Sequence, residues 1–260
     1  MEHRLDDRTA VITGGSLGLG RAMATAFHRA GADVALLARR EGPLEEAKSA
    51  IEAEPGGRVR AYPCDVTDPR QIEATHAQVV ADLGDVDILV NNAGQSQTGV
   101  FEEITDEVWQ ADLDLKLFAA IRFSRMVLPG MKERRWGRIV NILNTAAKAP
   151  PPRSAPTSVS RAAGMALTKV LSGEGAPHNV LVNALMIGSI KSDQIRRGYE
   201  ASGSELSFDE YVARAGERLP MGRVGEAEEC ASVALFLVSE GASYLTGCAI
   251  NMDGGVSRVV

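Results

Sequence analysis

The stretch Thr13-Gly14-Gly15-Ser16-Leu17-Gly18-Leu19-Gly20 lies between a short apolar run, 9–13, and a helical pattern that begins at Arg21. Glycines at such a junction let the backbone turn sharply and approach a pyrophosphate closely, and the following helix N-terminus supplies N–H donors. The spacing GxxxGxG differs from GxGxxG, so a tight turn without a ligand stays an alternative. In the dinucleotide interpretation, the cofactor is contacted by Gly14, Ser16, Leu17, Gly18, Leu19 and Gly20.

Apolar runs alternate with amphipathic stretches along the rest of the chain. The runs fall at 9–13, 34–38, 59–62, 86–90, 138–142, 180–184 and 249–251, and the helical patterns at 21–30, 43–53, 69–83, 108–131, 158–171 and 226–237. Continuous β-branched runs are typical of strands covered on both faces, and repeated β-then-α order favours a doubly wound arrangement. The sequence predicts an α/β fold: a single Rossmann-type doubly wound parallel sheet flanked by helices on both faces, in one domain over residues 1–260.

Two stretches interrupt this alternation. Residues 149–156 contain four prolines and cannot form a helix or a central strand. The segment near 193–218 is polar and helix-prone and follows a predicted strand. Long excursions beyond the carboxyl end of a strand carry the substrate lid in such folds, so we expect an inserted lid there.

The composition excludes several classes of protein. The 260 residues carry 28 Lys and Arg against 34 Asp and Glu, a net charge of −6, so no broad basic face for nucleic acid is expected. No apolar run approaches the roughly 18–20 residues of a membrane span, and residues 1–8 lack the apolar core of a signal peptide. Cys64, Cys230 and Cys248 are too scattered for a disulfide framework or a metal pair. We therefore expect a cytoplasmic protein without a metal site or a membrane partner.

The second predicted strand ends at Ala38-Arg39-Arg40. Sites for NAD usually place an acidic residue about 20 residues beyond the glycine turn, where it binds the ribose hydroxyls. Here that residue is absent, and two guanidinium groups, which suit phosphate, stand where a 2′-phosphate would lie. The sequence thus predicts NADP(H) rather than NAD(H), with a solvated basic pair at a strand end as the alternative.

Taken together, these motifs resemble those of the short-chain dehydrogenase/reductase superfamily, in particular its 3-oxoacyl-acyl-carrier-protein-reductase-like members, over nearly the full length. The similar segments are the glycine turn, Cys64-Asp65-Val66-Thr67-Asp68, Asn91-Asn92-Ala93-Gly94, 137–142, 220–225, 245–247 and 253–255. The resemblance implies a homo-oligomer, a dimer or tetramer, that moves hydride between a nicotinamide and a carbonyl or alcohol. It also implies cofactor contacts from Asp65, Val66, Asn91, Asn92, Ala93, Gly94, Arg161, Gly188, Ile190 and Ser192.

The catalytic positions depart from this family's set of Asn, Ser, Tyr and Lys. Matched residue by residue, they hold Lys116, Asn144, Thr157 and Arg161. In the family the tyrosine hydroxyl gives the proton and the lysine lowers its pKa, whereas here no Tyr-x-x-x-Lys occurs at all. The four tyrosines lie outside the matched segment, at Tyr62, Tyr199, Tyr211 and Tyr244.

The replacements retain part of this chemistry. The Asn144 amide can donate to a carbonyl oxygen, and Arg161 can bind ribose hydroxyls but cannot release a proton. Thr157 is a poor general acid at neutral pH. Lys116, buried near Arg161, should have a lowered pKa that suits a general acid. The structural alternatives are snorkelling for Lys116, backbone hydrogen bonds for Asn144 and Thr157, and packing for Arg161.

Two functions therefore stay open. One is an NADPH-dependent oxidoreductase with an altered proton-delivery set, acting on a carbonyl, alcohol, quinone or imine. The other is an NADP(H)-binding pseudoenzyme, or a non-redox lyase, isomerase or dehydratase on the same fold. The convergence of Lys116 and Arg161, flanked by Lys148, Arg153 and Lys191, also predicts an anionic small-molecule substrate, although these cations would equally suit the cofactor's own phosphates.

Overall fold

The computed structural model describes residues 3–260. Its strands form one sheet in the order β3-β2-β1-β4-β5-β6-β7, and every neighbouring pair is parallel. The strands are β1 (Thr9–Thr13), β2 (Asp33–Ala38), β3 (Val59–Pro63), β4 (Ile88–Asn91), β5 (Gly137–Asn144), β6 (Val180–Ile187) and β7 (Ala249–Met252). The predicted doubly wound parallel sheet is confirmed. β5 and β6 extend past their predicted ends because their pairing continues to Asn144 and Ile187.

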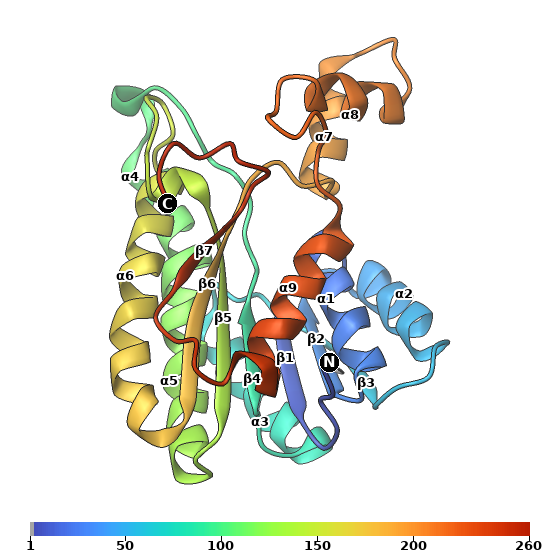
Figure 1. The fold of residues 1–260 in the computed structure, drawn as a ribbon, viewed down its shortest axis with the longest axis vertical. Helices are drawn as coiled ribbons and strands as arrows, with labels where there is room; N and C mark the ends of the chain where they lie inside the picture. The colour runs from blue at the N-terminus through green and yellow to red at the C-terminus, as the bar shows by residue number, and fades with distance from the viewer. Residues whose placement is uncertain (1–2) are drawn as a thin grey trace.

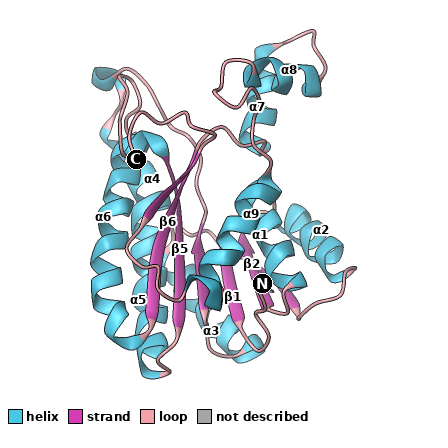
Figure 2. Cartoon of the chain, viewed as in Figure 1, coloured by secondary structure: helices cyan, strands magenta, loops and turns pink. Residues whose placement is uncertain are grey.

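Helices cover both faces of the sheet (Figure 2). One face carries α1 (Gly18–Arg29), α2 (Glu41–Glu52) and α9 (Ala227–Val238), and the other carries α3 (Pro69–Leu83), α5 (Ala119–Glu133) and α6 (Thr157–Gly175). Short 3₁₀ helices lie at Phe101–Glu103, Thr145–Ala147, Ala176–His178 and Glu240–Ala242. Buried side chains such as Phe27 and Phe123 fill the two layers between helices and sheet. This burial on both faces explains why the strands are apolar without alternation.

The helix expected over 108–131 is divided in the structure. It consists of α4 (Asp106–Leu113), a π-helical turn (Asp114–Phe118) and α5. The Ala119 N–H donates to the Asp114 carbonyl, five residues back. Such turns are frequent at functional sites, and this one contains Lys116.

The insertion near 193–218 is helical, as predicted, and rises beyond the carboxyl ends of the strands (Figure 1). It contains α7 (Asp193–Ser202) and α8 (Phe208–Gly216). A small aromatic cluster joins the two helices, with the Tyr199 ring 5.6 Å from Phe208 and 5.4 Å from Tyr211. A capping box between Ser207 and Glu210 starts α8. The insertion thus has its own local packing.

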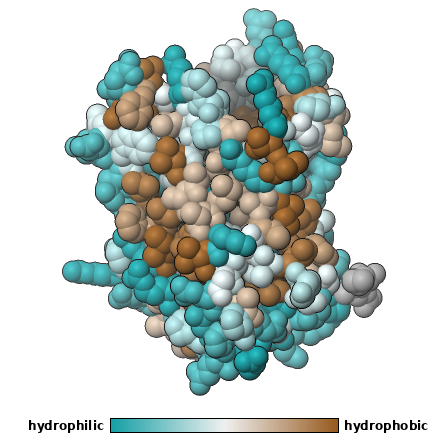
Figure 3. Space-filling model, turned by 60° about the vertical axis from the view of Figure 1, so that its left-hand side comes forward, coloured by the Kyte–Doolittle hydropathy of each residue, from teal (hydrophilic) through white to brown (hydrophobic). Residues whose placement is uncertain are grey.

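The surface on the α6 side of the molecule shows a broad band of apolar residues (Figure 3). Val159 and Val170 on α6 are 49% and 58% exposed. A homo-oligomer would cover such a surface, and oligomerisation stays a prediction. Across residues 3–260, no helix combines the length and the apolar character needed to cross a bilayer.

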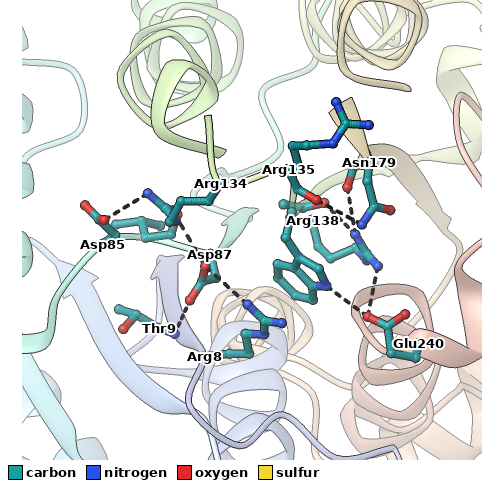
Figure 4. Close-up of polar contacts among 12 residues, drawn as sticks. Arg8, Thr9, Asp85, Asp87, Arg134, Arg135, Arg138, Asn179 and Glu240 are labelled. Carbon is teal, nitrogen blue, oxygen red and sulfur yellow. Dashed lines mark hydrogen bonds and ion pairs between the residues drawn. The ribbon is translucent and has the colours of Figure 1, made fainter. Parts of the chain in front are cut away.

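Charged side chains close the amino-terminal edge of the sheet (Figure 4). The Asp87 carboxylate accepts from the Thr9 N–H at 3.2 Å and lies 3.6 Å from the Arg134 guanidinium. Trp136 is stacked between two cations, with the guanidinium carbons of Arg8 and Arg138 at 3.7 and 4.3 Å from its ring centre. This cluster ties β1, β4 and β5 together at the edge opposite the glycine turn.

Arg138 is the most enclosed member of this edge cluster. It is 1% exposed and donates to the backbone carbonyls of Gly137 at 2.9 Å and Asn179 at 3.1 Å. Substituting Arg138→Met removes both hydrogen bonds and the contact of the guanidinium with the Trp136 ring, and should lower the free energy of unfolding by roughly 2–4 kcal/mol. Urea denaturation would measure the loss. Glu240→Gln, at a partner that is 71% exposed, is the control and should cost much less. Equal effects of the two substitutions would contradict this account.

Candidate functional site

The site lies where the sheet order reverses, between β1 and β4, at the carboxyl ends of the strands. The Thr13 hydroxyl accepts from the Asn92 N–H at 2.9 Å and the Ala93 N–H at 3.0 Å, and donates to the Val90 carbonyl. The Asn92 amide donates in turn to the carbonyls of Thr13 and Gly14, at 2.9 and 3.2 Å. The two loops that follow β1 and β4 are therefore held as one unit.

The glycine turn forms a cradle that side chains would fill. Gly14 and Gly18 have φ values of +66° and +52°, in the left-handed region that glycine adopts without strain. A Cβ on Gly20 would lie 2.6 Å from the Asn92 amide nitrogen and would collide with the Gly14 carbonyl. α1 starts after Leu17 with no side-chain cap, so its first N–H groups remain available to an anion. These features fit a dinucleotide pyrophosphate.

Two cavities adjoin this cradle. The first, of about 360 Å³, is lined by the glycine turn together with Asn92, Asn144, Thr157, Arg161, Gly188, Ile190 and Ser192. The second, of about 470 Å³, is lined by Ser16, Arg39, Arg40 and Val66 among others. Gly14, Ala93, Gly94 and Arg197 line both. Most of the residues expected to contact the cofactor thus border one of two adjoining cavities, as an extended dinucleotide would require.

Arg39 and Arg40 fit a phosphate at the second cavity. Both are exposed, and neither forms an ion pair within residues 3–260. Guanidinium groups without a protein counter-ion are suited to a phosphate ligand. This arrangement agrees with the prediction of a 2′-phosphate.

Two expected cofactor residues lie outside both cavities. The Asp65 carboxylate accepts from the Thr67 N–H at 3.0 Å and the Thr67 hydroxyl at 2.8 Å, so it holds the turn before α3. The Asn91 amide donates to the Asn141 side chain at 2.8 Å, and Asn141 donates to Thr168 at 2.9 Å. One Asp65 oxygen and the Asn91 amide nitrogen are thus used within the protein, and direct contact of either residue with the cofactor stays a prediction.

Lys116 lies in a buried polar network that the sequence did not reveal. Its ammonium forms an ion pair with Asp112, and both side chains are 2% exposed. It also donates to the Thr157 hydroxyl at 2.7 Å, while the second Asp112 oxygen accepts from Ser160 at 2.6 Å. Burial lowers the pKa of Lys116, the nearby Arg161 charge adds to this, and Asp112 opposes it. The pKa of Lys116 is thus lowered, as the sequence led us to expect, but Asp112, which the sequence prediction did not include, opposes this lowering.

Thr157 joins this network to the wall of the first cavity. Its hydroxyl donates to the Gln97 carbonyl at 2.7 Å and accepts from the Gln97 N–H at 2.8 Å as well as from Lys116. Every hydrogen-bonding position of the hydroxyl is thereby used. To reach a ligand, the O–H bond must rotate away from Gln97.

Arg161 and Asn144 carry unpaired polar atoms at the same cavity. One Arg161 nitrogen donates to the Ile142 carbonyl, but its Nε has no partner within residues 3–260, and neither does the Asn144 Oδ1. Burial lowers the pKa of Arg161 to about 10. Both residues line the first cavity. Buried polar atoms are normally paired, so these two are suited to a bound ligand.

Gly94 makes room for this arginine. A Cβ at Gly94 would lie 2.9 Å from the Arg161 Nη2 and 3.6 Å from the Lys116 side chain. The small residue in the Asn91-Asn92-Ala93-Gly94 segment thus permits the guanidinium to lie beside the cradle.

Lys116 and Arg161 lie close together as predicted, since a Cβ on Gly94 would approach both side chains, but the charges of this pair and of the three flanking cations do not combine at the first cavity. Lys116 is neutralised by Asp112, Lys148 donates to the Ala249 carbonyl at 2.7 Å, and Lys191 pairs with Asp209 at 3.3 Å. Arg153 is exposed and does not line the first cavity, which leaves Arg161 alone of the five. The anionic substrate that rested on this convergence stays a prediction.

A family model described as enoyl-(acyl carrier protein) reductase matches residues 14–257 of this chain. The chain is 36% identical over 248 residues to an acetoacetyl-CoA reductase from Rhizobium meliloti (strain 1021), covering 95% of this chain and 98% of that protein. The family match includes both the glycine turn and the four positions, 116, 144, 157 and 161, at which this chain lacks the Asn, Ser, Tyr and Lys set.

Two solved structures are similar over the whole chain. The L-sorbose reductase of Gluconobacter frateurii, in complex with NADPH and L-sorbose, has a TM-score of 0.94, is 32% identical and is covered over 100% of both chains. A short-chain oxidoreductase from Pseudomonas aeruginosa PAO1, bound to NADPH and containing an atypical catalytic center, has a TM-score of 0.91, is 38% identical and is covered over 99% of both chains.

The Asp112–Lys116 pair predicts a pH-dependent loss of stability on removal of the acid. Asp112→Asn leaves the buried ammonium without a counter-ion and should lower the free energy of unfolding by roughly 3–5 kcal/mol near neutral pH. Because the folded variant holds the Lys116 proton more weakly than the unfolded chain does, the loss should shrink as pH rises toward 10.5. Urea denaturation across pH would test this.

The matched control is Asp114→Asn, at a partly exposed acid on the same segment that lies 3.4 Å from Arg122. That variant should lose little stability and show no comparable recovery at high pH. A loss for Asp112→Asn that is small, or that does not change with pH, would contradict the buried ion pair.

Proposed function

The chain belongs to the short-chain dehydrogenase/reductase superfamily, and we propose that it is an NADPH-dependent reductase of a small-molecule carbonyl compound. The observation that carries the proposal is the hydrogen-bonded series from Asp112 through Lys116 to Thr157, which ends at the wall of the cofactor cavity. The series connects a titratable group, Lys116, to Thr157, which occupies the position of the family's tyrosine.

The cofactor assignment rests on the cradle and on the two arginines. The glycine turn and the start of α1 would hold the pyrophosphate, and Arg39 with Arg40 would bind the 2′-phosphate. The NADPH-bound neighbours support the same choice. Arg161 would bind the ribose beside the nicotinamide through its Nε, which lacks a protein partner within residues 3–260.

NADPH supplies the hydride when bound, and the protein must supply the proton. Asn144 and the fixed charge of Arg161 polarise the carbonyl oxygen. The Thr157 hydroxyl rotates from Gln97 toward that oxygen and gives up its proton while Lys116 gives one to Thr157. The product is an alcohol, and neutral Lys116 regains its proton from solvent between turnovers. Asp112 stays a carboxylate throughout and holds Lys116 in line with Thr157.

One observation favours a second candidate function. All hydrogen-bonding positions of Thr157 are used in the substrate-free structure, so the network also fits a purely structural role. An NADP(H)-binding protein without turnover, or with non-redox chemistry, is therefore the alternative. NADPH binding without oxidation by any member of a panel of carbonyl, quinone and iminium compounds would favour it.

The phosphate preference can be tested with an Arg39→Gln/Arg40→Gln double variant. Loss of charge-assisted contacts to the 2′-phosphate should weaken NADPH binding roughly 10- to 100-fold and leave NADH binding unchanged. Fluorescence titration of both cofactors would measure the two affinities. Lys48→Gln, on the helix that follows Arg40, is the control and should change neither. Equal weakening of both cofactors would contradict a 2′-phosphate contact.

The proton source can be tested by the pH profile of turnover. The rate of carbonyl reduction should fall as pH rises through the lowered pKa of Lys116, because the acid form is lost. Lys116→Gln should reduce kcat roughly 100-fold or more and abolish this limb. Steady-state kinetics from pH 6 to 10 would show both effects, with cofactor binding as the check that the variant is folded.

Lys148→Gln serves as the control for that experiment, because this lysine binds a backbone carbonyl outside the network. It should keep the wild-type profile. Wild-type turnover with an unchanged pH limb in Lys116→Gln would remove Lys116 from the mechanism.

A further inference from the structure

The start of α7 packs directly against the glycine turn. A Cβ on Gly18 would lie 3.7 Å from the Asp193 backbone nitrogen and 3.8 Å from the Ser192 Cβ. Ser192 and Asp193 line the first cavity together with the turn. Residue 197 follows one helical turn later on α7 and therefore lies above the glycine turn.

Arg197 is placed differently from the arginine beside it. It lines both cavities with Gly14, Ala93 and Gly94, and is the charged residue that the two linings share. Its neighbour Arg196 instead lies over the Phe208 ring, 4.2 Å from the ring centre, inside the lid. Two adjacent arginines thus point to different surroundings, one toward the cradle and one toward α8.

The Arg197 guanidinium is restrained but not buried. It forms an ion pair with Asp193, one turn earlier, at 3.4 Å, and its side chain is 56% exposed. No basic side chain of the glycine turn itself lines either cavity among residues 3–260. A pyrophosphate on the cradle would therefore receive backbone N–H donors from the glycine turn and one exposed cation from α7.

We propose that Arg197 binds the bridging pyrophosphate of the cofactor and thereby fastens the lid helices α7 and α8 over the loaded site. This inference rests on the proposed NADPH-dependent function and adds to it a contact from outside the glycine turn. Cofactor binding and lid closure become linked, because the same guanidinium belongs to the lid and contacts the cofactor. The lid then covers the substrate side only when the cofactor is in place.

The test compares Arg197→Gln with Arg196→Gln, which removes the same charge from the same helix. NADPH and NADH are titrated against each apo variant by fluorescence. Loss of a charge-assisted contact should weaken binding of both cofactors by Arg197→Gln by a similar factor, roughly 10-fold or more. Arg196→Gln should bind both as the wild type does.

Hydrogen exchange of 193–218 provides the second readout. NADPH should slow exchange there in the wild type and in Arg196→Gln, but not in Arg197→Gln at saturating cofactor. Unchanged affinity and unchanged protection in Arg197→Gln would overturn the proposal. Weaker binding of NADPH with unchanged binding of NADH would also overturn the proposal, because the contact would then be with the 2′-phosphate.

These outcomes are distinguishable from failure of the proposed function. If the wild type binds neither cofactor, the reductase proposal itself fails. If the wild type binds NADPH and the Arg39→Gln/Arg40→Gln variant weakens it while Arg197→Gln does not, the reductase proposal stands and the lid contact is rejected.

Discussion

The hydrogen bonds between the ends of β1 and β4 hold the rest of the site in place. The sheet order reverses between these strands, and the Thr13 hydroxyl and the Asn92 amide join the two loops that leave them. The glycine turn depends on this joint, because Asn92 also fixes the Gly14 carbonyl. The cofactor cradle is therefore built from backbone geometry that buried side chains maintain, and it makes no use of the residues proposed to do the chemistry.

The network that we propose delivers the proton is anchored on different elements. Asp112 and Lys116 come from α4 and the π-helical turn, whereas Thr157, Ser160 and Arg161 come from α6. A buried ion pair gains little stability by itself, since desolvation offsets the attraction. This pair is hydrogen-bonded to Thr157, which lines the first cavity, and a buried pair so placed favours a functional role in which its surroundings set the proton affinity of Lys116. The glycine turn and this network thus come from different elements of the chain, and Thr157 and Arg161 are where the network reaches the first cavity.

The sequence was sufficient for the sheet and for the cradle, because apolar runs and glycine spacing are local signals. α3 was predicted over Pro69–Leu83 without error, since Asp68 caps its start and Gly84 ends it with a positive φ. The Asp112–Lys116 pair has a helical i,i+4 spacing that could have been noticed, but its burial depends on packing against α6. The position of Arg197 depends on how the start of α7 packs against Gly18, and no local pattern in the sequence predicts that packing.

The two tryptophans of this protein, Trp136 and Trp109, can serve as separate fluorescence reporters. The chain has 2 tryptophans. Trp136 lies between guanidinium groups at the amino-terminal edge of the sheet, and Trp109 lies on α4 against Phe101, beyond the opposite edge. Emission from the first follows the alignment of β1 with β5, whereas emission from the second follows the helix that carries Asp112. Single-tryptophan variants would therefore resolve global unfolding from rearrangement beside the candidate site in the same molecule.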